Sequence, residues 1–167
     1  MPRLVPPKQW ECTARLEAHL QRRGWSRIAG CDEVGRGALM GPLVAAAVIL
    51  DPARSISGLN DSKKIAPDER ERLDAQIRSQ AVAYGVAFIE AREVDRLNVY
   101  QASRQAMIEA VRGLSPRPDF ILTDAMPLPG FPLPHRALIH GDSRSITIAA
   151  ASILAKVARD AHMRQLD

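Results

Sequence analysis

Four acidic residues stand where a predicted strand ends or a predicted helix begins, and together they could bind divalent cations. Asp32 and Glu33 close one strand, Asp124 follows another, and Asp142 lies just ahead of the last predicted helix. Mg²⁺ prefers carboxylate oxygens and keeps several waters, so a substrate phosphate can complete its octahedron. Two such ions about 4 Å apart can stabilise the attacking and leaving oxygens of a phosphodiester. The pattern therefore indicates metal-assisted phosphodiester cleavage.

The spacing alone leaves a structural alternative open. An aspartate after a strand is often a turn residue, and Asp142 could instead cap the last helix. Asp32 and Glu33 raise a further question, because successive strand residues point to opposite faces of a sheet. Both can serve one site only if the strand distorts there, or if one acts through its backbone carbonyl. Gly35 and Gly37 would make such a distortion easy.

The hydrophobic pattern predicts the elements that must position these acids. Strands are predicted over residues 26–33, 43–50, 82–89, 119–123 and 137–139. Helices are predicted over residues 8–23, from 67 to about 79, from 98 to about 114, and from 146 onward. Few helical residues separate the first two strands, which favours antiparallel pairing, whereas the later strands follow helices, which favours parallel pairing. The sequence therefore predicts an α/β fold in which helices flank a mixed five-stranded sheet.

Length and charge set weaker limits on function. The 167 residues, 46% of them hydrophobic and 25% charged, predict one compact domain. Aromatic residues make up only 4% of the chain, which argues against a stacking platform for single-stranded bases. The formal net charge is +4, but five basic and two acidic residues lie within residues 1–25, so the remainder is nearly neutral. Net charge alone therefore identifies no partner.

The composition also bears on the compartment. Cys12 and Cys31 cannot form a disulfide framework and lack the spacing of a zinc site. Free thiols fit a reducing compartment. The N-terminus has no apolar segment ahead of a cleavage site, and the longest apolar run, 38–50, is shorter than the roughly 20 residues of a membrane helix. We expect a cytoplasmic protein with no membrane partner.

Several segments, taken together and in order, carry a family resemblance. They are GCDEVGRG at 30–37, GPLVAAAV at 41–48, NDSKK at 60–64, GDSRS at 141–145 and AAASILAKVARD at 149–160. They closely resemble the motifs of ribonuclease HII, in that family's order and spacing, from about Ile28 to Met163. The resemblance implies a ribonuclease H-like fold, hydrolysis of the RNA strand in RNA–DNA hybrids, and incision beside single ribonucleotides in duplex DNA. The products would carry a 3′-hydroxyl and a 5′-phosphate.

The resemblance also implies a cofactor and a set of metal ligands. Mg²⁺ or Mn²⁺ would be the cofactor, and Asp32, Glu33, Asp124 and Asp142 match the family's four catalytic, metal-binding acids. Because the two-metal reaction needs no protein nucleophile, the scattered serines, histidines and cysteines are consistent with it. The protein is expected to act as a monomer on hybrids and on duplex DNA that contains ribonucleotides.

Two further segments match positions that contact substrate in the family. Gly35, Arg36 and Gly37 match the motif that senses the ribonucleotide 2′-hydroxyl. Ser62 and Lys63 match residues that hold substrate phosphates, where Lys63 would act as a point charge. In the last helix, the spacing of Lys156 and Asp160 predicts an ion pair, with substrate contact as the alternative.

The sequence departs from the family pattern at several points. Ala125-Met126 follows Asp124 where the family usually has Gly-Asn, and Ala38 replaces a usual proline. The chain ends at Asp167 within the last predicted helix, whereas the family continues for some tens of residues. That tail carries a tyrosine that packs against the sugar beside the ribonucleotide.

These departures shape the expected domains and the alternative functions. We expect an N-terminal helical extension over 1–25 and a C-terminally truncated ribonuclease H-like catalytic domain over 26–167. The alternative to the enzyme is a catalytically impaired hybrid-binding protein that lacks the C-terminal segment. A weaker alternative is a two-metal nuclease of the same fold with relaxed sugar specificity.

Overall fold

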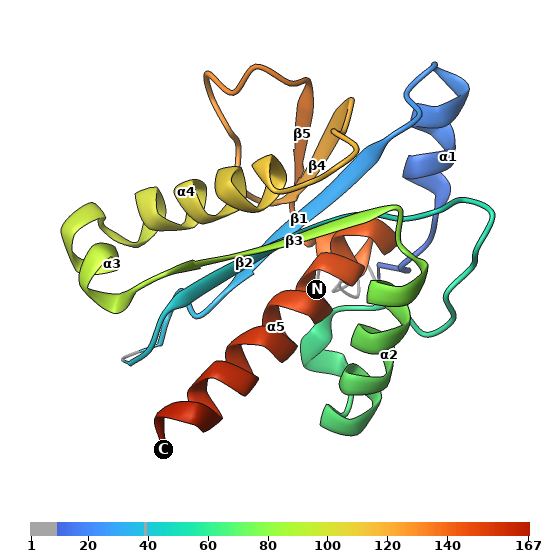
Figure 1. Ribbon diagram of the computed structural model, residues 1–167. Coiled ribbons are helices and arrows are strands. Elements are labelled where there is room, and N and C mark those ends of the chain that lie inside the picture. Colours follow the sequence, from blue (N-terminus) through green and yellow to red (C-terminus); the bar gives the residue numbers. More distant parts are fainter. Residues whose placement is uncertain (1–9, 39) are drawn as a thin grey trace, which may run out of the picture.

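The computed structural model of the protein describes residues 10–38 and 40–167. A mixed sheet forms in the strand order β3-β2-β1-β4-β5 (Figure 1). The strands are β1 (Ile28–Val34), β2 (Leu43–Ile49), β3 (Ala83–Ile89), β4 (Phe120–Asp124) and β5 (His135–Leu138). β2 pairs antiparallel with β1 and β3, whereas β4 pairs parallel with β1 and β5. The expected mixed five-stranded sheet is confirmed.

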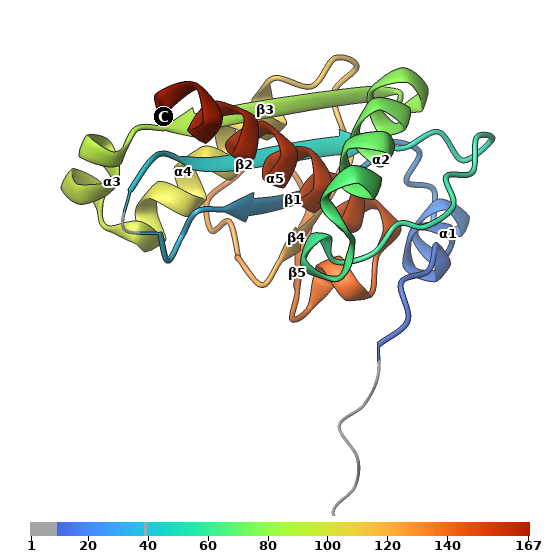
Figure 2. The same ribbon diagram turned by 90° about the horizontal axis from the view of Figure 1, so that it is seen from below.

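Helices cover both faces of this sheet. They are α1 (Arg15–Arg22), α2 (Pro67–Gln80), α3 (Ala91–Leu97), α4 (Val99–Arg112) and α5 (Ile146–Leu166), with short 3₁₀ helices η1 (Ser62–Lys64) and η2 (Gly141–Ser143). α4 lies across one face, and α5 and α2 lie on the other (Figures 1 and 2). Among the described residues, no helix is both long and apolar enough to span a membrane.

The alternation of side chains along β2 explains this layering. Leu43, Ala45, Ala47 and Ile49 pack in one apolar cluster with α4, while Val44, Ala46 and Val48 pack in another with α2 and α5. All seven β2 residues are buried, as an apolar run in a sheet covered on both faces requires. Its three alanines leave room for the helix backbones to come close.

Several helix ends follow their sequence signals. Pro67 occupies the first turn of α2, and the Asn98 side chain caps α4 by accepting a hydrogen bond from the Gln101 amide at 3.0 Å. Asn98 also ends the short helix α3, because its backbone has a positive φ of 71°. Helix α3 was not predicted, since its seven residues bury no side chain and carry no clear periodicity.

Two predicted elements have different bounds in the structure. The helix predicted over 8–23 is wrong in its first half, since α1 begins at Arg15, and residues 8 and 9 lie outside the described residues. Thr13 instead forms a parallel bridge with Ser145, and the Ile146 amide donates to the Thr13 carbonyl at 3.3 Å. These tertiary contacts occupy backbone groups that a longer helix would use. The last strand, predicted over 137–139, lies at 135–138 because β4 sets its register.

Helix α5 approaches the sheet most closely at Gly30. A Cβ atom on this β1 residue would lie 2.2 Å from the Thr147 carbonyl carbon and 2.4 Å from the Ile148 nitrogen. Only glycine therefore allows the first turn of α5 to rest directly on β1. This contact brings the turn that precedes α5 to the end of β1.

Substituting Gly30 with alanine tests this close approach. The clashing atoms belong to backbone and cannot rotate away, so we expect Gly30→Ala to lower the free energy of unfolding by about 3 kcal/mol in urea denaturation. Gly37→Ala is the matched control, because a Cβ atom at Gly37 would meet no atom within 4 Å. Equal losses in the two variants would contradict this packing.

Candidate metal centre

Three of the four acids singled out in the sequence converge at one edge of the sheet. Asp32 lies near the end of β1, Asp124 ends β4, and Asp142 lies in η2 just before α5. One carboxylate oxygen from each lies within 4.8 Å of the others. β1 and β4 run parallel, so their carboxyl ends meet at the same edge. Asp32 is 5% exposed and Asp142 is 7% exposed, so two of the acids are buried.

Glu33 lies beside this group of three. β1 stays paired with β2 through Val34, so the strand backbone is not distorted at Asp32 and Glu33. The side chain of Asp32 nevertheless lies close enough to Glu33 to lower its pKa through a hydrogen bond. Burial raises the pKa of Glu33, and the Asp124 charge raises it further, while Arg36 lowers it. The Arg36 guanidinium lies 3.9 Å from the carboxylate, and the buried Oε2 atom has no hydrogen-bond partner among the described residues. Glu33 thus stands at the margin of the cluster with one oxygen unsatisfied.

Burial and mutual repulsion dominate the electrostatics of the three aspartates. Burial holds the pKa of Asp32 well above its usual range, and the charges of Asp124 and Glu33 add to this effect. The pKa of Asp142 is raised to about 7, first by burial and then by the charges of Asp124 and Asp61. Carboxylates in this arrangement bind protons more tightly than free carboxylates do, unless a cation compensates their charge.

Asp61 is a neighbour of the cluster to which the sequence analysis assigned no role. Its charge raises the pKa of both Asp124 and Asp142. It also caps η1 by accepting a hydrogen bond from the Lys63 amide at 3.0 Å. The only signal in the sequence was its place beside Ser62 and Lys63, which is not enough to separate a capping residue from a site residue.

The two predicted phosphate-binding residues have different surroundings. Lys63 is exposed, and its positive charge lowers the pKa of Asp124 and Asp142, so the charge lies near enough to act on the acids. Ser62 is buried, and its hydroxyl accepts a hydrogen bond from the Ser152 hydroxyl at 2.9 Å. Lys63 therefore lies beside the acids, whereas the Ser62 side chain anchors η1 to α5.

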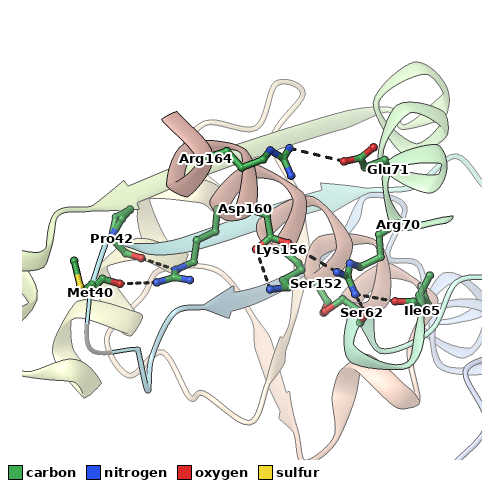
Figure 3. Close-up of polar contacts among 11 residues, drawn as sticks. Met40, Pro42, Ser62, Ile65, Arg70, Glu71, Ser152, Lys156, Asp160 and Arg164 are labelled. Carbon is green, nitrogen blue, oxygen red and sulfur yellow. Dashed lines mark hydrogen bonds and ion pairs between the residues drawn. The ribbon is translucent and has the colours of Figure 1, made fainter. Parts of the chain in front are cut away.

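A polar network between α2 and α5 holds η1 in place (Figure 3). Arg70 donates to the Ser62 carbonyl at 3.1 Å and to the Ile65 carbonyl at 2.7 Å, and it lies 3.8 Å from Asp160. Asp160 also accepts from Lys156 at 2.9 Å, which confirms the predicted ion pair. These contacts orient the helix and the loop relative to each other.

The segment Gly35–Gly37 is supported by the same helix. Gly35 has a φ of +94°, and a Cβ atom there would lie 2.8 Å from the Pro42 carbonyl oxygen, so glycine is needed for both reasons. Arg159 donates to the Pro42 carbonyl at 3.0 Å and to the Met40 carbonyl at 2.8 Å. Arg159, a single side chain of α5, therefore fixes the loop between β1 and β2, which begins just after Glu33.

The residues after Asp124 show how the chain accommodates Ala125-Met126. Ala125 adopts a left-handed φ of +57°, a conformation that favours glycine. Met126 is 2% exposed and packs in the apolar cluster under α4, away from the acids. Asp124 is held instead by the Gly141 amide, which donates to its Oδ1 atom at 2.8 Å.

The donor set fits a divalent cation. Asp32, Asp124 and Asp142 offer hard carboxylate oxygens, the type that Mg²⁺ and Mn²⁺ take in proteins. The unsatisfied Oε2 atom of Glu33 and the raised pKa values of the aspartates both indicate missing positive charge at this edge. The arrangement therefore offers the ligands that a divalent cation needs.

A mixed sheet of this topology, with carboxylates gathered at the ends of β1 and β4, defines an α/β protein of the ribonuclease H-like class. The sequence profile of one family within this class, ribonuclease HII, matches residues 29–167. The chain belongs to the ribonuclease HII family, which is a family of hydrolytic enzymes.

Individual relatives agree with this assignment. The chain is 56% identical over 159 residues to a ribonuclease HII of Solibacter usitatus, a match that covers 95% of this chain and 69% of that protein. It is 52% identical over 160 residues to a ribonuclease HII of Geobacillus kaustophilus, with 96% of this chain and 61% of the relative covered. The crystal structure of ribonuclease H2 from Pyrococcus horikoshii matches with a TM-score of 0.74 at 26% identity, over 84% of this chain and 75% of that one. The chain therefore spans about two thirds of the length of these two sequence relatives.

Replacing Ala125 with glycine should relieve backbone strain beside Asp124. A left-handed residue with a Cβ atom costs about 1–2 kcal/mol, so we expect Ala125→Gly to raise the free energy of unfolding by about 1 kcal/mol. Ala66→Gly is the control, because Ala66 is exposed and has an ordinary φ of −62°. The control should lose stability, and a loss in both variants would contradict strain at Ala125.

The raised pKa of Asp142 predicts how stability depends on pH without metal. Its folded pKa of about 7 lies above the ordinary value of 3.8, so stability is lost as pH rises through about 7 and is regained as pH falls toward 4. In EDTA at pH 8, Asp142→Asn should therefore raise the free energy of unfolding by more than about 1.4 kcal/mol.

The difference in the free energy of unfolding between wild type and Asp142→Asn should shrink toward zero as pH falls from 7 to 4, the range between the folded and the ordinary pKa of Asp142. Urea denaturation of both proteins in EDTA at several pH values measures this difference. A variant that is less stable than wild type by the same amount at every pH would contradict the repulsion among the aspartates.

Proposed function

We propose that this chain is a metal-dependent endoribonuclease that hydrolyses the RNA strand of RNA–DNA hybrids. We further propose that it incises at single ribonucleotides in duplex DNA and leaves a 3′-hydroxyl and a 5′-phosphate. The observation that carries the proposal is the convergence of Asp32, Asp124 and Asp142 within 4.8 Å in a ribonuclease HII chain. The same convergence speaks against a protein that only binds hybrids, because binding alone would not require costly burial of like charges.

The four proposed catalytic acids would together bind Mg²⁺ or Mn²⁺. The chemistry that two such ions supply when bound is activation of a water and stabilisation of the leaving 3′-oxygen. Asp32, the most buried of the three aspartates, would hold the ions together with Asp124 and Asp142. Glu33 would direct its unsatisfied oxygen to the same site. The Gly141 amide would keep Asp124 in place during the reaction.

Substrate recognition would fall to two loops beside the acids. The backbone of Gly35, Arg36 and Gly37 would contact the ribonucleotide 2′-hydroxyl, and Arg36 and Gly37 are exposed as this contact requires. Lys63 would hold a backbone phosphate, because it is exposed on η1 and its positive charge acts on the acids beside it. Ser62 would act through its backbone, since its hydroxyl is already bound to Ser152.

The setting follows from this activity. Hybrids and ribonucleotide-containing duplexes are the proposed partners, and a single copy of the chain carries all the proposed ligands. We place the protein in the cytoplasm, where the free thiols of Cys12 and Cys31 remain reduced.

A cleavage assay tests the proposal. The protein is incubated with a labelled DNA duplex containing one ribonucleotide, in Mg²⁺ or Mn²⁺, next to an all-DNA duplex and an RNA–DNA hybrid. We expect incision beside the ribonucleotide, no cleavage of the all-DNA duplex, and complete inhibition by EDTA. Asp32→Asn should lower the rate by more than about 100-fold, because it removes a metal ligand from a buried site.

The outcomes separate the candidate functions. Glu69→Gln, a change at an acid outside the cluster, should cleave like wild type. Binding of the hybrid without cleavage would favour the non-catalytic alternative, and equal cleavage of the all-DNA duplex would favour a nuclease with relaxed sugar specificity.

A further inference from the structure

Glu17 is a buried acid on α1 that the proposed chemistry does not use. It is 6% exposed, and its Oε1 atom accepts hydrogen bonds from the Ser145 hydroxyl, from the Thr147 hydroxyl at 2.7 Å and from the Thr147 amide at 3.1 Å. These donors lie 128 and 130 residues further along the chain, at the start of α5. Glu17 therefore connects the N-terminal segment to the helix that follows Asp142.

The burial of Glu17 is not explained by stability alone. Its Oε2 atom is buried without a hydrogen-bond partner among the described residues, and such an atom forfeits its hydration without replacement. The start of α5 also has its own cap, since Ser145 Oγ accepts a hydrogen bond from the Ile148 amide at 3.2 Å. The Glu17 carboxylate instead orients the capping hydroxyl of Ser145, because that hydroxyl donates a hydrogen bond to it.

The same contacts reach the metal centre through the turn that carries Asp142. The Ser145 amide donates to the Gly141 carbonyl at 2.8 Å, and the Gly141 amide donates to Asp124 Oδ1 at 2.8 Å. Thr13, on the same N-terminal segment, accepts from the Ile146 amide at 3.3 Å. The N-terminal segment therefore makes hydrogen bonds to the chain within four residues of Asp142.

This turn needs external support. η2 is only three residues long, and His140 before it has a left-handed φ of 55°, so the turn has little intrinsic stability. Asp142 is repelled by Asp124 and Asp61, which would push the turn away from the cluster. Contacts that hold Ser145 and Thr147 from the far side oppose this displacement.

We propose that Glu17 is a positioning residue of the metal centre, which holds the Gly141–Ser145 turn so that Asp142 stays poised opposite Asp32 and Asp124. This inference rests on the proposed function only for the consequence to catalysis. Its direct consequence is for metal affinity, because an acid that is free to swing out binds a cation less tightly.

The experiment measures Mn²⁺ binding by calorimetry without substrate, together with the melting temperature of each variant. Glu17→Ala removes the acceptor and should weaken Mn²⁺ binding about 10-fold. Glu17→Gln keeps an oxygen in the position of Oε1 and should recover most of the affinity. Glu11→Ala, which removes an exposed glutamate from the same segment, should leave the affinity unchanged.

A double-mutant cycle shows whether the effect passes through Asp142. In the Asp142→Asn background, Glu17→Ala should change Mn²⁺ affinity by less than about 2-fold, because the ligand that it positions is already altered. If Glu17→Ala does not fold, Thr147→Val removes one of the three hydrogen bonds and should weaken binding about 3-fold. In turnover, kcat should fall with the metal affinity while KM for the hybrid stays constant.

A lower melting temperature with unchanged Mn²⁺ affinity would overturn the inference and leave Glu17 a purely structural residue. An equal loss of affinity in both backgrounds would overturn it as well. The proposed function is tested separately: it holds if the wild-type protein cleaves the ribonucleotide-containing duplex and the Asp32→Asn variant does not.

Discussion

The repulsion among buried carboxylates is the constraint on which the rest of the structure depends. Asp32, Asp124 and Asp142 lie within 4.8 Å of one another, and burial raises the pKa of each. Such groups push apart unless a cation compensates them, so each must be held by contacts outside the cluster. Strand pairing holds Asp32, the Gly141 amide holds Asp124, and the turn before α5 holds Asp142. Holding these acids together therefore costs stability as long as no cation compensates their charge.

Helix α5 connects these supports. Its first turn rests on Gly30, which places Asp142 beside the end of β1, and Ser152 in its middle anchors the loop that carries Lys63. Nearer its end, Arg159 holds the loop that follows Glu33. One rigid element therefore sets the relative positions of the acids and of both proposed substrate loops, and the N-terminal segment braces its first turn.

Most of the fold was predictable because its signals are local. The apolar run of β2, the proline at the start of α2 and the Asn98 cap of α4 each act within a few residues. Strand bounds were accordingly close. The short connection between β1 and β2 predicted their antiparallel pairing, but intervening helices did not predict the rest: β2 and β3 pair antiparallel with α2 between them, and β4 and β5 pair parallel with no helix between them in the described residues 125–134. The first half of the helix predicted over 8–23 was wrong because Thr13 pairs with Ser145, a contact that no local pattern reports.

The sequence by itself determined which acids to consider, since Asp32, Glu33, Asp124 and Asp142 end strands or precede a helix in motifs of one family. Only the tertiary structure decided that Glu33 stands at the margin of the group of three and that Asp61 lies beside it. It alone also decided that Glu17 is buried against α5. The physical reason is that burial and charge coupling depend on contacts between distant segments, whereas periodicity and capping depend on neighbours along the chain.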